Sequence, residues 1–301
     1  MPARFCAYPP DRAALLRVLD EGATYRIGRA DDCEIRLDHP SISRFHAELA
    51  GAAGHWRLQD TGSKNGLSVD GRLTRRAEFA EPTWFLIGDV YCSLEPLDAD
   101  AEAAYRIEGD ERRATSRALS ARLDPNLGIG TLLPQTLDLV LQLSGLERGF
   151  VLYAPAGQPL RVRAMRGLRA GELAERHFAG SAAAVERALA SGEHVVCADT
   201  SASPWLGARP SVRIGGIRAL ICVPLKLGDG AAGVVYADSR RPGPPVTELD
   251  LELVEHVTHQ AASAIEAARL ERRLADVLRA VADAGAEGPA WDDLRAHRDP
   301  H

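Results

Sequence analysis

Frequent turn signals divide the first 97 residues into short runs of strand-forming residues. Turn-forming pairs lie between these runs, among them Asn65-Gly66 and Asp70-Gly71. No long helical stripe appears before residue 98. This spacing of turns favours an all-β sandwich or barrel. The predicted strands are 15–19, 24–27, 34–37, 45–49, 55–59 and 67–69, with two more within 84–94.

The pattern changes after residue 97. Residues 98–128 alternate acidic and basic side chains among alanines, which predicts a charged linker, either solvated chain or an exposed helix. Helical and strand patterns then alternate, with Leu133, Leu137 and Val140 at helical spacing. The further predictions are strands at 150–153 and 161–165, a helix at 182–190 ended by Gly192, and a hairpin of 219–227 with 232–236.

A long helix is predicted near the end of the chain. Thr247 is suited to cap it, and Asp250 gives it an acidic first turn. Its later part carries apolar residues at alternating spacings of four and three, a short a/d seam of Leu270, Leu274, Val277 and Val281. Residues 271–301 are predicted to be a helix extension and a frayed tail. The expected fold is multidomain: an all-β domain, the linker, an α+β domain with an antiparallel sheet over 129–270, and the long C-terminal helix.

Charge and cysteine usage exclude several classes of protein. The 301 residues include 36 Lys and Arg against 42 Asp and Glu, a net charge of −6. This balance argues against nucleic acids and anionic membranes as partners. The five cysteines lie far apart with no C-x-x-C pair, so neither a metal site nor a disulfide framework is expected. No stretch is long enough to span a bilayer, and residues 1–10 lack the apolar core of a signal peptide, so we expect a cytoplasmic protein.

Three segments of the β region carry residues suited to phosphate. They are Ile27-Gly28-Arg29, Ser41-Ile42-Ser43-Arg44-Phe45-His46 and Ser63-Lys64-Asn65-Gly66. Turn residues at one end of a sandwich can converge on a ligand while the sheets hold them in place. Arginine grips phosphate oxygens, a serine hydroxyl donates to one more, and asparagine can both donate to and accept from a peptide backbone. The alternative is a sandwich whose turns contain these residues only because turns favour them.

The order and separation of these segments closely resemble the forkhead-associated (FHA) domain, a β-sandwich that recognises phosphothreonine peptides. The resemblance covers residues 1–97. It implies that Arg29 and Ser43 bind the phosphate and that Asn65 hydrogen-bonds the main chain of the peptide. By the same resemblance, Arg44 and Lys64 flank the pocket.

The resemblance also assigns supporting roles and shows two departures. Gly28, His46 and Gly66 would support the site from within, with His46 bracing the phosphate-binding loop rather than touching the ligand. Leu67 stands where the family usually has a threonine. Asp70 stands where asparagine is common, which is expected to add a negative charge near the binding loops.

The second domain resembles a different family. The apolar strand 217–225, the following Gly233-Val234-Val235-Tyr236 and the long final helix resemble the closing hairpin and exit helix of a GAF domain, an α/β sensor module, over residues 129–270. That family includes binders of cyclic nucleotides, haem, bilins and small metabolites, and members without a known ligand. The signature of the cyclic-nucleotide binders is absent, so no cofactor is predicted and the GAF ligand stays unknown.

Four residues of this domain have a functional and a structural interpretation. Cys197 and Cys222 could attach a bilin, but their apolar surroundings favour buried structural cysteines. His256 and His259 could hold a metal, but a solvated helix face is the favoured interpretation. We therefore predict no metal site.

No catalytic motif is present. Gly62-Ser63-Lys64 lacks the upstream glycine and the following helix of a P-loop, and neither G-x-S-x-G nor H-E-x-x-H occurs. The predicted function is a non-enzymatic cytoplasmic signalling adaptor that binds a phosphothreonine protein, a Ser/Thr kinase or its substrate. The GAF domain would sense a ligand or, with the C-terminal helix, form a homodimer.

Two other functions stay open. In one, the protein is a small-molecule sensor whose GAF occupancy is the primary signal and whose FHA domain only localises it. In the other, it is a structural scaffold. The FHA–GAF pair resembles the front end of larger bacterial regulators, and output is expected to come through a partner.

The linker contains a candidate phosphorylation site. Arg112-Arg113-Ala114-Thr115 resembles the preference of basophilic Ser/Thr kinases. A phosphate on Thr115 would add close to two negative charges to a segment expected to move freely, and an FHA pocket on the same chain or a dimer partner could bind it. The alternative is a solvated linker whose arginines pair with Asp110 and Glu111.

Overall fold

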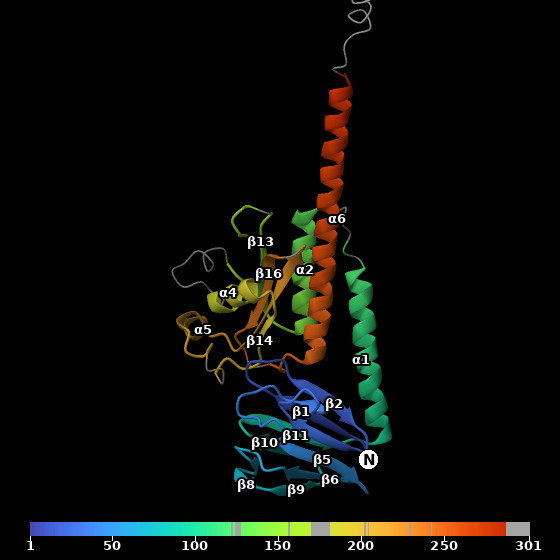
Figure 1. Cartoon of the computed structure of the whole chain (residues 1–301), viewed down its shortest axis with the longest axis vertical. Helices are drawn as coiled ribbons and strands as arrows, with labels where there is room; N and C mark the ends of the chain where they lie inside the picture. Colours follow the sequence, from blue (N-terminus) through green and yellow to red (C-terminus); the bar gives the residue numbers. More distant parts are fainter. Residues whose placement is uncertain are drawn as a thin grey trace, which may run out of the picture.

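The computed structural model describes residues 1–121, 123, 128–155, 157–169, 181–201, 203, 205–228, 230–241 and 243–286. A β domain lies at one end of the molecule, an α+β domain is stacked on it, and a long helix rises beyond both (Figure 1). The predicted fold class, an all-β domain followed by an α+β domain with an antiparallel sheet and a long C-terminal helix, is confirmed.

The β domain is a sandwich of two sheets. Their strand orders are β2-β1-β11-β10-β7-β8 and β4-β3-β5-β6-β9. Alternate residues of each strand face inward, so Phe5, Leu49 and Trp56 are fully buried between the sheets. The strands are β1 Ala3–Tyr8, β2 Leu15–Leu19, β3 Thr24–Gly28, β4 Ile35–Arg36, β5 Ala47–Ala52, β6 His55–Asp60, β7 Leu67–Val69, β8 Arg72–Thr74, β9 Arg76–Phe79, β10 Thr83–Ile87 and β11 Val90–Pro96.

The sequence pattern does not predict three of these strands. β1 lies between Pro2 and Pro9, which weaken its strand pattern, yet it pairs with both β2 and β11 and is second from the edge of its sheet. β8 and β9 are short and polar, and their strand conformation comes from pairing with β7 and β6. Tertiary pairing therefore decides these segments rather than local preference.

The predicted linker forms a helix, the second of the two alternatives considered for it. Helix α1 spans Ala99–Ser120 and begins at Asp98, whose carboxylate accepts the Ala101 N–H at 2.8 Å. It lies beside α6 (Glu248–Ala286) in Figure 1. The expectation of a freely moving segment is therefore wrong for 98–121, because a capped helix packed on a second helix has little freedom.

The second domain is built on one antiparallel sheet of order β13-β12-β16-β15-β14. The predicted helix and hairpin of this region are both present, and Gly192 ends α4 in the left-handed conformation. The elements are α2 Ile129–Ser144, β12 Arg148–Tyr153, β13 Arg161–Arg166, α4 Ala182–Ser191, β14 Val195–Cys197, α5 Pro210–Gly215, β15 Ala219–Leu227 and β16 Gly230–Ser239.

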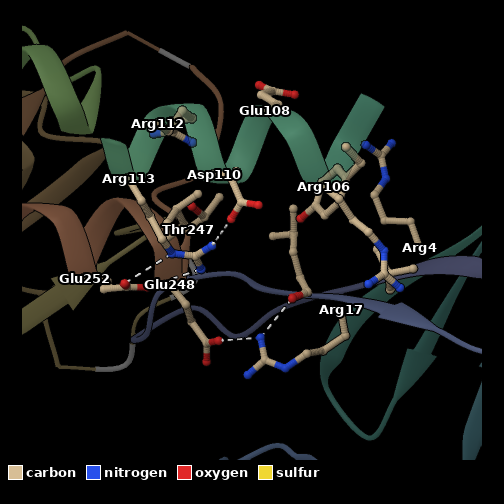
Figure 2. Close-up of a pocket in the computed structure, with 15 residues that line it drawn as sticks. Arg4, Arg17, Arg106, Glu108, Asp110, Arg112, Arg113, Thr247, Glu248 and Glu252 are labelled. Atoms are coloured by element: carbon tan, nitrogen blue, oxygen red, sulfur yellow. Dashed lines mark hydrogen bonds and ion pairs between the residues drawn. The ribbon is translucent and has the colours of Figure 1, made fainter. Parts of the chain in front are cut away.

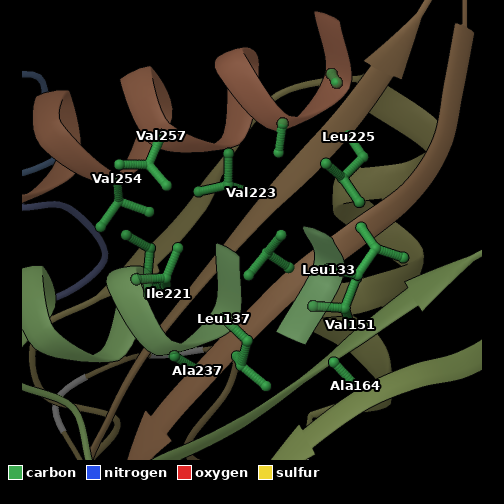
Figure 3. Packing of buried hydrophobic residues seen from close by; sticks show 14 of the residues in the cluster. Leu133, Leu137, Val151, Ala164, Ile221, Val223, Leu225, Ala237, Val254 and Val257 are labelled. Atoms are coloured by element: carbon green, nitrogen blue, oxygen red, sulfur yellow. The ribbon is translucent and has the colours of Figure 1, made fainter. Parts of the chain in front are cut away.

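One face of this sheet is covered by α2 and α6 (Figure 3). Leu133 and Leu137 come from α2, and Val254 and Val257 from α6. These side chains are almost fully buried against the sheet, where they meet Val223 of β15. The residues next to Val223 along β15 face the opposite side, so both faces of the strand are buried, which explains its unbroken apolar run.

The start of α6 is fixed by a reciprocal cap. The Thr247 hydroxyl accepts the Asp250 N–H at 3.2 Å, and the Asp250 carboxylate accepts the Thr247 N–H at 2.7 Å. This arrangement satisfies two backbone donors that a helix terminus otherwise leaves without partners. The N-cap predicted at Thr247 is therefore present.

We expect Leu137→Ala to lower the free energy of unfolding of the second domain by about 2–5 kcal/mol, because the side chain is fully buried between α2 and the sheet. Leu160→Ala is the control, since that leucine is 42% exposed; its expected cost is below about 1 kcal/mol. Urea denaturation followed by circular dichroism measures both. Equal losses in the two variants would contradict this packing.

Candidate functional site

Two loops at one end of the β-sandwich are joined by backbone hydrogen bonds. The Arg29 N–H, in the β3–β4 loop, donates to the Ser43 carbonyl of the β4–β5 loop at 2.9 Å. The Ala30 N–H donates to the Arg44 carbonyl at 3.1 Å. These two bonds hold the start of the first loop against the second and bring Arg29 beside Ser43.

Side chains join the second loop to the β6–β7 loop. The Ser43 hydroxyl accepts the Lys64 N–H at 3.0 Å. The Asn65 side-chain amide donates to the Ser41 carbonyl at 2.8 Å. His46, fully buried, links both loops, because its Nδ1 accepts the Ser43 N–H at 3.1 Å and its Nε2 lies 3.0 Å from the Gly66 carbonyl. The three loops thus form one connected structure.

Gly28 makes the close approach of the first two loops feasible. A Cβ atom at this position would lie 2.1 Å from the Arg44 carbonyl oxygen, far inside van der Waals contact. Gly66, at the end of the third loop, has a φ of 72°, which favours glycine. Both glycines therefore stand where a side chain would disturb the loop junction.

The residues that face outward at this end are cationic. Arg29, Arg44 and Lys64 are exposed, and no ion pair to any of the three side chains occurs among the described residues. Ser43 is half-buried between them. A hollow of about 730 Å³ lies alongside the third loop and reaches Leu73 and Arg75. An anion can approach all four residues without displacing an internal carboxylate, and the hollow leaves room for an extended chain.

The resemblance-based interpretation overlooked two organising residues. The Ser41 hydroxyl accepts the Asp89 N–H at 2.9 Å, which joins the β10–β11 turn to the second loop. The Asp60 carboxylate accepts the N–H groups of Gly62 and Ser63, both at 3.2 Å, and so shapes the third loop. Burial acts to raise the pKa of Asp60, but hydrogen bonds from the Ser63 side chain and from these two N–H groups outweigh it and hold the pKa below its ordinary value. An Asp two residues before a Gly is a turn signal that could have indicated this role.

The two departures from the family pattern lie in β7 and directly after it. Leu67 is fully buried in the sandwich core. Asp70 follows the three-residue strand β7, whose other end adjoins the third loop, so strand length places it about 10 Å from that loop. The effect of the Asp70 charge on peptide binding stays a prediction. Asp70 has a φ of 50°, a conformation that both Asn and Asp tolerate.

Another cavity lies where β2, α1 and the start of α6 meet. It has a volume of about 780 Å³, and five arginines line it (Figure 2). Each of the five pairs with a carboxylate: Arg4 with Glu95, Arg17 with Glu248, Arg106 with Glu102, Arg112 with Asp250 and Arg113 with Glu252. Because the charges are compensated internally, this cavity is a structural junction rather than an anion site.

The other candidate residues are not assembled into sites. Cys197 and Cys222 are fully buried, and burial raises the pKa of Cys197 to about 12, which makes a reactive thiolate unfavourable. His256 and His259 lie on α6, and within the described residues no three potential ligands gather as a metal would require. Among the helices that the structure describes, none has both the length and the apolar character needed to cross a membrane.

Thr115 lies on α1, exposed to solvent. The two arginines before it are engaged mainly with α6: Arg112 pairs with Asp250, and Arg113 with Glu252 at 3.3 Å. Arg113 also forms an ion pair with Asp110 on α1, at 3.6 Å. Among the described residues, neither arginine forms an ion pair with Glu111. Phosphorylation of Thr115 stays a prediction, and it would require local opening of α1.

Comparisons with known proteins agree with this architecture. Residues 25–90 match the family model of the FHA domain, and residues 129–265 match that of the GAF domain. No curated protein matches the chain.

Solved structures resemble one domain at a time. The FHA-1 domain of Mycobacterium tuberculosis Rv1747 is 26% identical and covers 32% of this chain and 97% of its own, with a TM-score of 0.28. The FHA domain of Chlamydia trachomatis CT664 is 30% identical over 32% of this chain and 99% of its own, with a TM-score of 0.28. A GAF domain region from Geobacter sulfurreducens PCA is 20% identical over 47% of this chain and 95% of its own, with a TM-score of 0.39.

We expect His46→Ala to destabilise the β domain by about 2–5 kcal/mol, because it removes a buried ring and leaves the Ser43 N–H and the Gly66 carbonyl without partners. His55→Ala is the matched control, since His55 is exposed on β6 and should change the free energy of unfolding by less than about 0.5 kcal/mol. Tryptophan fluorescence during urea unfolding measures both. A His46→Ala variant as stable as the control would show that the loops hold together without this bridge.

Proposed function

Because the chain carries an FHA domain followed by a GAF domain, we propose that it is a signalling adaptor that binds proteins phosphorylated on threonine. The observation that carries the proposal is the set of Arg29, Arg44 and Lys64, exposed and without ion pairs among the described residues, around the Ser43 hydroxyl. A phosphorylated side chain carries close to two negative charges and three acceptor oxygens. Such a group complements three cations and a hydroxyl donor.

Each residue has a defined role in this proposal. Arg29 and Ser43 bind the phosphate. The Ser43 oxygen already accepts the Lys64 N–H, so the hydroxyl proton is free to point at a phosphate oxygen. Asn65 uses one amide hydrogen on the Ser41 carbonyl and keeps its carbonyl oxygen and second hydrogen for the main chain of the peptide. Arg44 and Lys64 flank the phosphate and supply charge.

The second domain adds a homodimer interface in this proposal. Beyond the sheet, α6 continues as a helix that no other described element covers, and its apolar residues are about 60% exposed: Leu270, Leu274, Val277, Leu278 and Val281. Four of these residues form the predicted a/d seam, and they can pack against the same four residues on α6 of a second copy. Burying apolar area contributes roughly 25 cal/mol per Å² to association.

The alternative function is a small-molecule sensor in which GAF occupancy is the primary signal. The packing inside the domain argues against a ligand there. The rings of Phe150 and Tyr236 are stacked with their centroids 4.7 Å apart, and both fill the sheet face opposite α2 and α6 with fully buried side chains. We therefore favour the adaptor, non-enzymatic and cytoplasmic, with a Ser/Thr kinase or its substrate as the phosphorylated partner. A thermal-shift screen of metabolites distinguishes the two functions, since the sensor requires a stabilising ligand.

Arg29→Ala is expected to weaken phosphothreonine-peptide binding by roughly ten- to a hundredfold, because a hydrogen bond to a charged group is worth about 1.5–3 kcal/mol. The full chain is screened against a degenerate phosphothreonine peptide library, and calorimetry on the best peptide gives the Kd. Arg57→Ala, which removes an exposed arginine from β6, is the matched control and should bind as the wild type does. The unphosphorylated peptide should not bind. Normal binding by Arg29→Ala would show that the phosphate lies elsewhere.

For the dimer, light scattering on the full chain should give twice the monomer mass at high micromolar concentration. Leu274→Glu is expected to produce a monomer, because it places a charge in the centre of the seam. Leu73→Glu, which changes an equally apolar but more exposed residue of the β domain, should leave the mass unchanged. A wild-type monomer at that concentration would contradict the dimer and leave the phosphopeptide proposal intact.

A further inference from the structure

We infer that Arg12, outside the segment that matches the FHA model, is a positioning residue for the phosphate-binding loop and couples that loop to the GAF domain. This inference rests on the proposed phosphopeptide function. It comes from one ion pair: an Arg12 guanidinium nitrogen lies 2.5 Å from an Asp38 carboxylate oxygen. Asp38 belongs to the β4–β5 loop, and Arg12 to the β1–β2 connection.

Backbone hydrogen bonds hold the β1–β2 connection against the GAF domain. The Pro10 carbonyl accepts the Ala198 N–H at 3.2 Å. The Ala14 N–H donates to the Val246 carbonyl at 2.8 Å, and its carbonyl accepts the Glu248 N–H at 3.0 Å.

A packing contact and a cavity also place the β1–β2 connection against the GAF domain. Ala13 is buried in the GAF hydrophobic core. Arg12 itself lines a cavity of about 420 Å³ together with His194, Lys226, Glu255 and His259 of the GAF domain. The backbone that carries Arg12 is therefore held by the GAF domain, which sets the point from which the side chain reaches Asp38.

Asp38 connects directly to the loop that holds the phosphate-binding hydroxyl. Immediately before it, the Leu37 N–H donates to the Gly28 carbonyl at 2.8 Å. Immediately after it, the His39 ring lies 2.8 Å from the Ser41 hydroxyl. The backbone carbonyl of Ser41 accepts a hydrogen bond from the Asn65 side-chain amide. A shift of Asp38 is thus transmitted through two neighbouring residues to the groups that face the peptide.

The coupling follows from linkage. A phosphopeptide that binds the β4–β5 loop in this arrangement favours the Arg12–Asp38 contact, and the contact favours docking of the β1–β2 connection on the GAF domain. By reciprocity, a docked GAF domain strengthens phosphopeptide binding by the same factor. Since the ion pair is partly exposed, that factor is about two- to fivefold.

Asp38→Asn is the decisive variant, because the two explanations predict opposite signs. If only overall charge mattered, removal of a carboxylate near a phosphate site would tighten binding. If Arg12 positions the loop through Asp38, Asp38→Asn weakens binding about two- to fivefold, as does Arg12→Ala, and the double variant is no weaker than either single one. Arg17→Ala is the matched control: Arg17 pairs with Glu248 at 2.8 Å across the same domain junction but does not contact the loop, so its Kd should stay unchanged.

The measurement is the Kd of the full chain and these variants for the best phosphothreonine peptide of the library. Hydrogen exchange with and without that peptide gives a second readout: peptide binding should slow exchange at the Ala14 and Glu248 amides in the wild type and in Arg17→Ala, but not in Arg12→Ala. Equal or tighter binding by Asp38→Asn, or unchanged exchange in the wild type, overturns the coupling while the phosphopeptide function stands. A wild type that binds no phosphopeptide overturns both.

Discussion

The hydrogen bonds that join three loops at one end of the β-sandwich determine what this surface can bind. Loops expose backbone donors and acceptors that need partners when they are buried. His46 satisfies two of these groups from inside the domain, and Ser43 and Asn65 satisfy one each between neighbouring loops. Because these bonds fix the loops relative to one another, Arg29 and the Ser43 hydroxyl are held side by side before any ligand arrives, which lowers the conformational cost of binding.

The arginines of the proposed phosphate site differ from the structural arginines in whether a carboxylate pairs with them. Around the cavity between β2, α1 and α6, each of the five lining arginines pairs with a carboxylate. The pairs of Arg17, Arg112 and Arg113 join β2 and α1 to the start of α6. At the loop end, Arg29, Arg44 and Lys64 have no such partner among the described residues. In a chain with a net charge of −6, a local group of uncompensated cations attracts a specific anion without making the whole protein a binder of polyanions.

The sequence predicted the elements that local patterns specify and missed those that depend on pairing. Turn residues and alternating strands identified the β domain, and the capping signals at Thr247 and Gly192 located the ends of two helices. The sequence did not predict strands β1, β8 and β9, because their conformation depends on pairing with neighbouring strands. Within the site, single residues such as Arg29 and His46 could be named from their order. The proposed role of Arg12 could not be predicted from the sequence, because only the folded chain brings Arg12 to Asp38, 26 residues away.

The central claim, that the three loops form a phosphothreonine site, is tested most directly by amide chemical shifts of the isotope-labelled full chain. The chain is titrated in parallel with a phosphothreonine peptide and with its unphosphorylated form. The structure predicts that the phosphorylated peptide shifts the amides of Arg29, Ser43, Lys64 and Asn65 first, because these groups surround the phosphate or the peptide backbone. Identical shifts with both peptides, or shifts confined to the GAF domain, would contradict the claim.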